Sequence, residues 1–228
     1  MELVFEPSPA VIVPTTDGRG FPVRRVFCIG RNYAAHAREM GSDPDRDPPF
    51  FFTKWAEAVV PSGTIAYPPQ TKNYHFEAEL VVAIGASGRD IAPENAARHI
   101  FGYACGLDMT RRDLQNAAKD KGRPWDTGKN VEQSAPIGPI KPGNALMGAG
   151  AITLTKNGEV KQAGDLADMI WPVADVIAYI SRFYRLEPGD LIYTGTPEGV
   201  GPVVEGDQLT VHIDGLDDLS VTIGPAAE

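Results

Sequence analysis

The stretch of sequence that decides the fold is His75-Phe76-Glu77-Ala78-Glu79-Leu80-Val81-Val82-Ala83-Ile84. Its second half is apolar at every position, which is typical of a strand buried on both faces in the middle of a sheet. Its first half alternates, so a continuous strand would place His75, Glu77 and Glu79 on one face. Buried carboxylates are costly unless something neutralises them. The stretch therefore predicts a central strand with a charged site at its start.

A further carboxylate, Asp108, ends the apolar run 100–107 and precedes a polar, helix-like segment. Because hard divalent cations prefer oxygen ligands, Glu77, Glu79 and Asp108 are candidate ligands of one metal ion. From spacing alone, the solvated face of an edge strand is the competing interpretation of the two glutamates. His75 is a candidate fourth ligand, although a supporting structural role suits it better.

Short strands and a few helices account for the rest of the chain. The expected strands are residues 10–13, 26–29, 50–53, 101–109, 191–194, 208–213 and 219–223, and the expected helices are residues 33–40, 93–99, 111–120 and 172–184. Asn32 and Thr110 are expected to cap two of these helices. Asn157-Gly158, between two strand-like runs, predicts a hairpin over residues 152–162.

The composition and the order of elements predict the fold class. Hydrophobic residues make up 43% of the 228 residues, and 24 Gly and 20 Pro favour a loop-rich β architecture. Strands interspersed with few helices predict a mixed α+β fold rather than a doubly wound sheet. We expect residues 1–22 to form an N-terminal strand and turn segment, and residues 23–228 to form the main domain.

Charge and hydropathy argue against several classes of function. The net charge of −9 makes nucleic acid an unexpected partner, since binding it needs a basic face. No apolar run reaches the ~18 residues needed to span a bilayer, and the first residues lack the features of a signal peptide. We therefore expect a soluble, cytoplasmic protein without a membrane partner. The locally basic segment 111–129 suits a small anionic ligand.

His36 and Glu39 form a second candidate constellation. Residues three apart on a helix share a face, so the two side chains can meet. A glutamate beside a histidine can orient the ring and make it a general base near neutral pH. The alternative is an ion pair on a solvated helix face.

The polar segment after Asp108 offers candidate substrate contacts. Arg112 and Gln115 share a helix face and can hold a substrate carboxylate, unless Asp113 pairs with the arginine instead. Lys129, in a glycine-containing loop, can stabilise an oxyanion or enolate, although loop lysines are usually solvated.

A glycine-rich turn follows the strand expected at residues 191–194. The backbone N–H groups of this turn and the Thr196 hydroxyl can bind a carboxylate. The turn is not a phosphate-binding loop, because the GK[ST] ending is missing.

Together these segments resemble the fumarylacetoacetate hydrolase family in its short single-domain form. The motifs that carry the resemblance, between residues 23 and 224, are Gly30-Arg31-Asn32-Tyr33-Ala34-Ala35-His36, His75-Phe76-Glu77-Ala78-Glu79-Leu80, Asp108 to Gln115, Lys129, and Thr194-Gly195-Thr196-Pro197-Glu198-Gly199-Val200-Gly201-Pro202. Phe76 departs from the pattern, since close relatives often have histidine there. The resemblance implies a mixed β-sandwich roll of the family's C-terminal type with a few short helices, assembled as a homodimer.

The resemblance also implies roles for individual residues. Mg²⁺ or Mn²⁺ would be held by Glu77, Glu79 and Asp108, and His36 with Glu39 would activate water on a mobile helix. Lys129 matches the family's catalytic lysine. The implied substrate contacts are Arg31, Lys54, Arg112, Gln115, Gly195 and Thr196.

The implied reaction is metal-dependent hydrolysis of a carbon–carbon bond in a 2,4-dioxo acid. Residues 21–33 and 48–54 most resemble the branch of the family that cleaves fumarylpyruvate to fumarate and pyruvate in gentisate breakdown. Hydrolysis of a shorter acylpyruvate and decarboxylation of oxaloacetate are alternatives with the same metal site. An isomerase or hydratase would not need a water-activating pair, and a non-catalytic module that chelates oxo acids is the alternative from another class.

Overall fold

The centre of the fold is strand β8 (Ala78–Ile84), whose seven residues are all buried. It lies between β15 and β9 in an eight-stranded sheet, which agrees with the central strand expected from its apolar sequence. The computed structural model that reveals this sheet describes residues 3–39 and 49–226, and for residues 37–39 the backbone alone.

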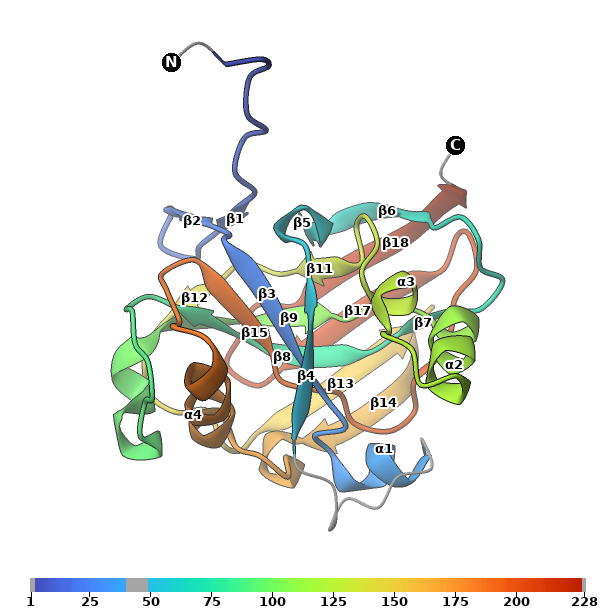
Figure 1. Cartoon of the computed structure of the whole chain (residues 1–228). Helices are drawn as coiled ribbons and strands as arrows, with labels where there is room; N and C mark the ends of the chain where they lie inside the picture. Colours follow the sequence, from blue (N-terminus) through green and yellow to red (C-terminus); the bar gives the residue numbers. More distant parts are fainter. Residues whose placement is uncertain (1–2, 40–48, 227–228) are drawn as a thin grey trace.

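The described chain contains four α-helices, three 3₁₀ helices and eighteen strands (Figure 1). The helices are α1 (Ala34–Glu39), α2 (Arg112–Asp120), α3 (Asp126–Lys129), α4 (Val173–Phe183), η1 (Ala56–Ala58), η2 (Pro93–His99) and η3 (Leu166–Asp168). The strands are β1 (Ile12–Pro14), β2 (Gly20–Pro22), β3 (Arg25–Gly30), β4 (Phe50–Lys54), β5 (Val59–Pro61), β6 (Gly63–Tyr67), β7 (Tyr74–Phe76), β8 (Ala78–Ile84), β9 (Ile100–Leu107), β10 (Thr110–Arg111), β11 (Ala135–Ile137), β12 (Lys141–Pro142), β13 (Ala151–Lys156), β14 (Glu159–Asp165), β15 (Asp190–Tyr193), β16 (Gly201–Pro202), β17 (Gln208–Ile213) and β18 (Leu219–Ala226).

The eight-stranded sheet runs in the order β4-β3-β15-β8-β9-β11-β5, with β12 paired to β9. β8 is antiparallel to both neighbours, whereas β15 and β3 run parallel. The start of β8 therefore lies at the same edge as the ends of β9, β15 and β3. Glu77, Glu79 and Asp108 lie at this edge.

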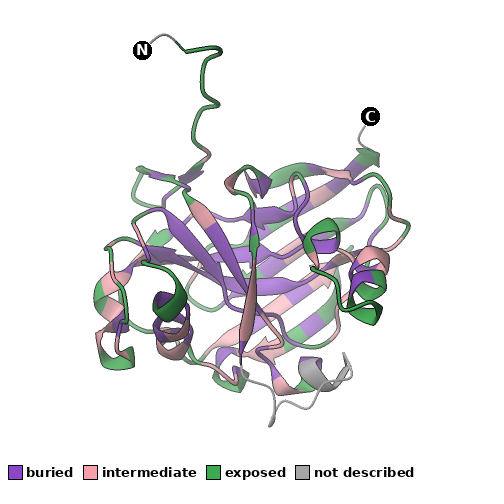
Figure 2. Ribbon diagram, viewed as in Figure 1, coloured by how far each residue is buried: buried purple, intermediate pink, exposed green. Residues whose placement is uncertain are grey.

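Two apolar layers enclose the eight-stranded sheet. On one face, Leu80, Val82 and Ile84 of β8 belong to a core shared with α4 and with a second sheet, whose order is β14-β13-β17-β18-β6. On the other face, Val81 and Ala83 belong to a smaller core that includes the N-terminal hairpin β1–β2. This alternation explains why β8 has to be apolar at every position. Figure 2 shows the buried central strands and the exposed periphery.

One prediction about the deciding stretch is wrong. Residues 75–84 are not one strand, because β7 ends at Phe76 and β8 begins at Ala78. β7 belongs to a separate small sheet with β10 and β16, so the chain passes from one sheet to another at Glu77. His75 consequently lies in a different sheet from Glu79.

The two expected helix caps are also wrong. Thr110 lies in β10, and helix α2 begins after it with Arg112 and no side-chain cap. The Asn32 side chain reaches across the chain, where Nδ2 donates to Trp171 O (2.9 Å) and Thr194 O (2.8 Å). The segment 93–99 is helical, but as a 3₁₀ helix.

Other expectations are confirmed. β13 and β14 form the predicted antiparallel hairpin, and both Asn157 and Gly158 have positive φ, as a two-residue hairpin turn requires. The fold class is the expected mixed α+β roll with few short helices. The domain boundary at residue 22 stays a prediction. In the described residues, no helix is long and apolar enough to cross a membrane.

Candidate active site

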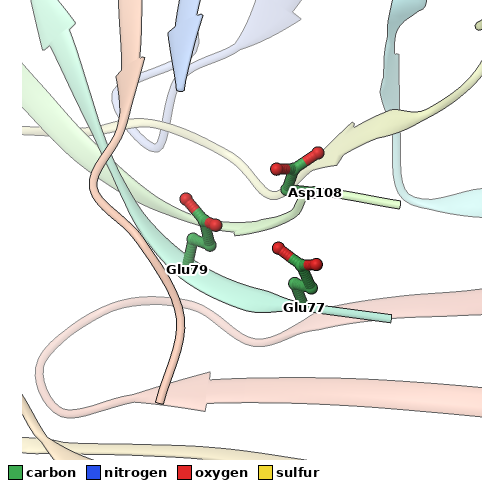
Figure 3. A group of neighbouring side chains, drawn as sticks. All are labelled: Glu77, Glu79 and Asp108. Atoms are coloured by element: carbon green, nitrogen blue, oxygen red, sulfur yellow. The ribbon is translucent and has the colours of Figure 1, made fainter. Parts of the chain in front are cut away.

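Strand register brings three carboxylates together at one edge of the large sheet. The antiparallel pairing of β8 with β9 sets Ala78 opposite Leu107, so Glu77 and Asp108 are direct neighbours. Asp108 N donates to Glu77 O at 2.9 Å. Carboxylate oxygens of Glu77, Glu79 and Asp108 all lie within 4.8 Å of one another, and the side chains point toward one another (Figure 3). Each residue is at most 5% exposed.

Two buried cations contact Glu77. Lys129 Nζ lies 2.9 Å from Glu77 Oε2 and 2.7 Å from Asp108 Oδ2, so it bridges two of the three carboxylates. Arg112 donates to Glu77 Oε1 and to Gln115 Oε1. Burial alone would raise the pKa of Glu77, but the charges of Lys129 and Arg112 outweigh it and hold that pKa below its usual range. Glu77 is therefore ionised in this arrangement.

Glu79 lies in a different electrostatic environment. Among the described residues, its carboxylate accepts one hydrogen bond, from Gly195 N at 2.8 Å. Burial and the neighbouring charges of Asp108 and Glu77 raise the pKa of Glu79 well above its usual value. Unlike Glu77 and Asp108, Glu79 thus has no ion-pair partner among the described residues, and its neutral form is favoured.

The donor set fits a hard divalent cation. Three buried carboxylates supply only oxygen ligands, which is the chemistry that Mg²⁺ and Mn²⁺ prefer. Asp108 Oδ1 accepts no hydrogen bond from the described residues, although Lys54 Nζ lies 2.9 Å away outside hydrogen-bond geometry. A divalent cation beside Glu79 would favour its ionised form, because it would offset the burial and the neighbouring negative charges that raise its pKa.

Lys54 is buried and surrounded by acceptors. Besides its ion pair with Asp108, its ammonium donates to Met109 O (3.0 Å), to Ser134 Oγ (2.8 Å) and to Lys129 O. Its side chain is 0% exposed and does not line the cavity in front of the carboxylates. The substrate contact that the family resemblance implies for Lys54 stays a prediction, and in this structure its ammonium supports Asp108 and the end of α3.

Helices α2 and α3 hold Arg112, Gln115 and Lys129 in place. Gly128 allows the two helices to approach, since a Cβ there would lie 2.8 Å from Gln115 N. Lys129 also lies over the ring of Phe52, 5.1 Å from its centroid. Arg112 Nε is buried and has no hydrogen-bond acceptor among the described residues.

The turn after β3 carries Arg31 to the same cavity, and helix α1 carries His36 there. Gly195 has φ +97°, and a Cβ there would lie 2.7 Å from Asn32 Cβ, so glycine is needed where the two turns meet. His36 is buried at 5% exposure and lines the cavity. The side chain of Glu39, its expected partner, lies outside the described residues.

The structure brings together most of the predicted site residues. The cavity is lined by Arg31, His36, Glu77, Glu79, Asp108, Arg112, Gln115, Lys129 and Thr196. Gly195 contacts the site through its N–H group to Glu79. His75 is outside the lining and pairs with Asn73 Oδ1 at 2.8 Å.

Several residues of the site were not predicted from the sequence. Gln162 is 1% exposed and joins three segments: Oε1 accepts from Ala78 N (2.9 Å), while Nε2 donates to Thr196 Oγ1 (2.8 Å) and Pro197 O (2.8 Å). Phe52, Lys119 and Trp125 also line the cavity. No sequence pattern singles out Gln162, a lone glutamine in the polar run of β14. Lys119 could have been predicted, because it lies on the same face of the helix as Arg112 and Gln115.

Comparison with known proteins identifies the family. The sequence model of the fumarylacetoacetate (FAA) hydrolase C-terminal family matches residues 25–224. The chain belongs to the fumarylacetoacetate hydrolase family. This confirms the resemblance inferred from the motifs.

Individual members of the fumarylacetoacetate hydrolase family match almost the whole chain. A fumarylpyruvate hydrolase from Ralstonia sp. is 50% identical over 191 residues, which cover 82% of this chain and 100% of the relative. A crystal structure of fumarylpyruvate hydrolase from Pseudomonas aeruginosa in complex with Mn²⁺ and pyruvate is 52% identical, has a TM-score of 0.96, and is matched over 98% of this chain and 100% of its own. An oxaloacetate tautomerase from Escherichia coli is 39% identical over 198 residues, covering 86% of this chain and 90% of the relative.

Proposed function

We propose that this protein is a divalent-metal-dependent hydrolase that cleaves fumarylpyruvate into fumarate and pyruvate. The observation that supports this most directly is the buried cluster of Glu77, Glu79 and Asp108 in a cavity that is also lined by cations. The Ralstonia and Pseudomonas relatives carry this activity in their names, and pyruvate, bound in the Pseudomonas structure, is one product of the reaction.

Mg²⁺ or Mn²⁺ is the proposed cofactor, with Glu77, Glu79 and Asp108 as its ligands. When bound, such an ion supplies Lewis acidity toward the oxygens of an oxo acid. Lys54 is proposed to fix Asp108 from behind, since its ammonium is fully enclosed.

His36 is the proposed general base, and Glu39 the residue that orients its ring. His36 is buried and faces the cavity, so a water molecule there lies within its reach. Removal of a proton from that water produces a hydroxide that adds to C4 of the substrate, and the C3–C4 bond then breaks. His36 then returns this proton to C3 of the departing pyruvate enolate. The overall reaction therefore consumes one water molecule.

Lys129 and Arg112 are proposed to hold the negative charge of the substrate. Lys129 has three donors, of which two face Glu77 and Asp108, so one remains for the developing enolate oxygen. Arg112 Nε is a buried donor without an acceptor among the described residues, and a substrate carboxylate would satisfy it. Gln115, Gly195, Thr196 and Arg31 are proposed as further substrate contacts.

The experiment is turnover of fumarylpyruvate, followed by loss of its enol absorbance, with chelated protein and after return of Mg²⁺ or Mn²⁺. We expect activity only with metal and none in the variant Glu77→Ala. His36→Ala should lose hydrolysis but keep metal binding, measured by calorimetry. Lack of turnover with either metal, or full turnover in Glu77→Ala, would contradict the proposal.

Chemistry on oxaloacetate is the second candidate function. Two relatives support it. One is the oxaloacetate tautomerase from Escherichia coli, and the other is an oxaloacetate decarboxylase from Dictyostelium discoideum, which is 40% identical over 198 residues. The same cluster of carboxylates and cations can bind oxaloacetate, another 2-oxo acid. A kcat/KM for oxaloacetate above that for fumarylpyruvate would favour this second function.

We further propose that the protein acts in the cytoplasm, as a homodimer, in the breakdown of gentisate. Family membership supports a shared assembly, and the identity to fumarylpyruvate hydrolases supports the pathway. Analytical ultracentrifugation tests the dimer: a sedimenting mass of one chain, 24.5 kDa, would contradict it.

A further inference from the structure

Helix α2 carries a third polar residue on the face that lines the cavity. Lys119 follows Gln115 by four positions and Arg112 by seven, so the three side chains share one helix face. All three line the cavity. Arg112 and Gln115 are buried beside the carboxylates, whereas Lys119 is exposed in the last turn. The face thus leads from the carboxylate cluster to the cavity mouth.

Arg31, another cationic residue that lines the cavity, packs against two aromatic rings. Its guanidinium carbon lies 5.4 Å from the centroid of Phe50 and 5.9 Å from that of Trp125. These two rings pack edge to face with their centroids 5.2 Å apart. Arg31 has φ 58°, a conformation that is costly for a residue with a side chain and that clusters at functional sites. The fold therefore fixes this guanidinium where it lines the cavity.

The deep and outer parts of the cavity differ in how far their cations are exposed. At the deep end, Lys129 and Arg112 are bound to Glu77, and Lys129 also to Asp108. Together with a divalent cation, this end would recognise one carboxylate and its adjoining oxo group. Arg31 and Lys119 are the more exposed cations of the lining, and the binding of one carboxylate does not require them.

We propose that Lys119 and the Arg31 guanidinium held on Trp125 form a second carboxylate subsite, which selects acylpyruvates whose acyl group itself ends in a carboxylate. This inference rests on the proposed function, because it assigns the far end of the substrate of the same site. Fumarylpyruvate has such a distal carboxylate and acetylpyruvate does not. Selectivity is a difference of affinities, and a cation that meets only the longer substrate creates that difference.

The test compares these two substrates in matched variants. Lys119→Met removes the charge and keeps the apolar stem, while Lys119→Arg keeps the charge. Lys121→Met is the control, because Lys121 is exposed on the same segment but lines a different depression, with Leu114 and Pro124. We measure kcat and KM for both substrates, and use the inhibition constant of acetylpyruvate if it binds without turnover.

We expect Lys119→Met to lower the preference for fumarylpyruvate over acetylpyruvate by about tenfold, as loss of a charge-assisted contact predicts. The change should lie in KM rather than kcat, because this contact is made equally before and during the reaction. Lys119→Arg should retain the preference, and Lys121→Met should stay within about twofold of the wild type, as is usual for surface substitutions.

Three results would overturn the subsite. A preference that is unchanged in Lys119→Met, or changed equally in Lys121→Met, would show that Lys119 does not meet the distal carboxylate. A kcat that falls equally for both substrates would place Lys119 with the catalytic pair instead. Wild-type protein that turns over neither substrate would contradict the proposed function itself, which is a separate outcome.

Discussion

Gln162 is the residue whose replacement tests the architecture of the site most sharply. Its side chain makes hydrogen bonds to the backbone of Ala78, between Glu77 and Glu79, and to both Thr196 and Pro197. Gln162→Ala would leave the buried N–H of Ala78 and the carbonyl of Pro197 without these partners.

The expected loss of stability in Gln162→Ala follows from those hydrogen bonds. Leaving a buried polar group unsatisfied costs about 1–3 kcal/mol, so two such groups lower the free energy of unfolding by about 3 kcal/mol. For a chain of this length, each kcal/mol corresponds to roughly 2–4 °C, which predicts a fall in Tm of about 6–12 °C. Displacement of Ala78 should also weaken metal binding, because it moves the glutamates on either side.

Scanning calorimetry of the metal-free protein measures the change in stability, and titration calorimetry with Mn²⁺ measures the change in affinity. Gln208→Ala is the matched control, since Gln208 is exposed on β17, and it should stay within about 0.5 kcal/mol of the wild type. A loss below about 1 kcal/mol in Gln162→Ala, or an equal loss in the control, would refute the reasoning.

Four other predictions follow from the packing and charge of the site. Lys54→Met should lower the free energy of unfolding by about 3–5 kcal/mol in denaturant titrations, because it removes one of the two buried ion pairs of Asp108 and the donor to Met109 O and Ser134 Oγ. Gly128→Ala should cost about 1–3 kcal/mol and reduce kcat, since the added Cβ collides with α2, whereas Gly148→Ala, with open space around it, should be near neutral. Burial lowers the pKa of His75 to about 4 from its usual 6.5, so the unfolded chain binds the extra proton between these values. Stability should therefore fall as the pH drops from 6.5 toward 4, and His75→Gln should flatten this slope in unfolding curves recorded at pH 7 and pH 5. Finally, Mn²⁺ at 100 times its Kd should raise the free energy of unfolding by about 2.7 kcal/mol, and EDTA should reverse the gain.

The local pattern of the sequence was enough to find the centre of the fold. The apolar run from Leu80 to Ile84 identified a strand buried on both faces, because only such a strand is apolar at every position. The Asn157-Gly158 turn identified its hairpin, since both positions require positive φ. These features depend on residues close together in the chain.

The features that were not predicted from the sequence depend on residues far away along the chain. The break at Glu77 arises because β7 pairs with β10 and β16. No residue between His75 and Ile84 indicates that change of sheet. Lys54 resembles a substrate-binding residue in its motif, but the carbonyls of Met109 and Lys129 enclose it. Both outcomes are set by segments more than twenty residues away along the chain.

The position of β15 in the large sheet has a consequence for how the protein is made. β15 (Asp190–Tyr193) separates β3 from β8 and pairs with both, although β3 ends at Gly30. During synthesis, one edge of β3 and one edge of β8 therefore stay unpaired until β15 has emerged. Such edges are prone to pair with other chains. β15 thus closes the sheet, and truncation before Asp190 should yield insoluble product because these edges stay open.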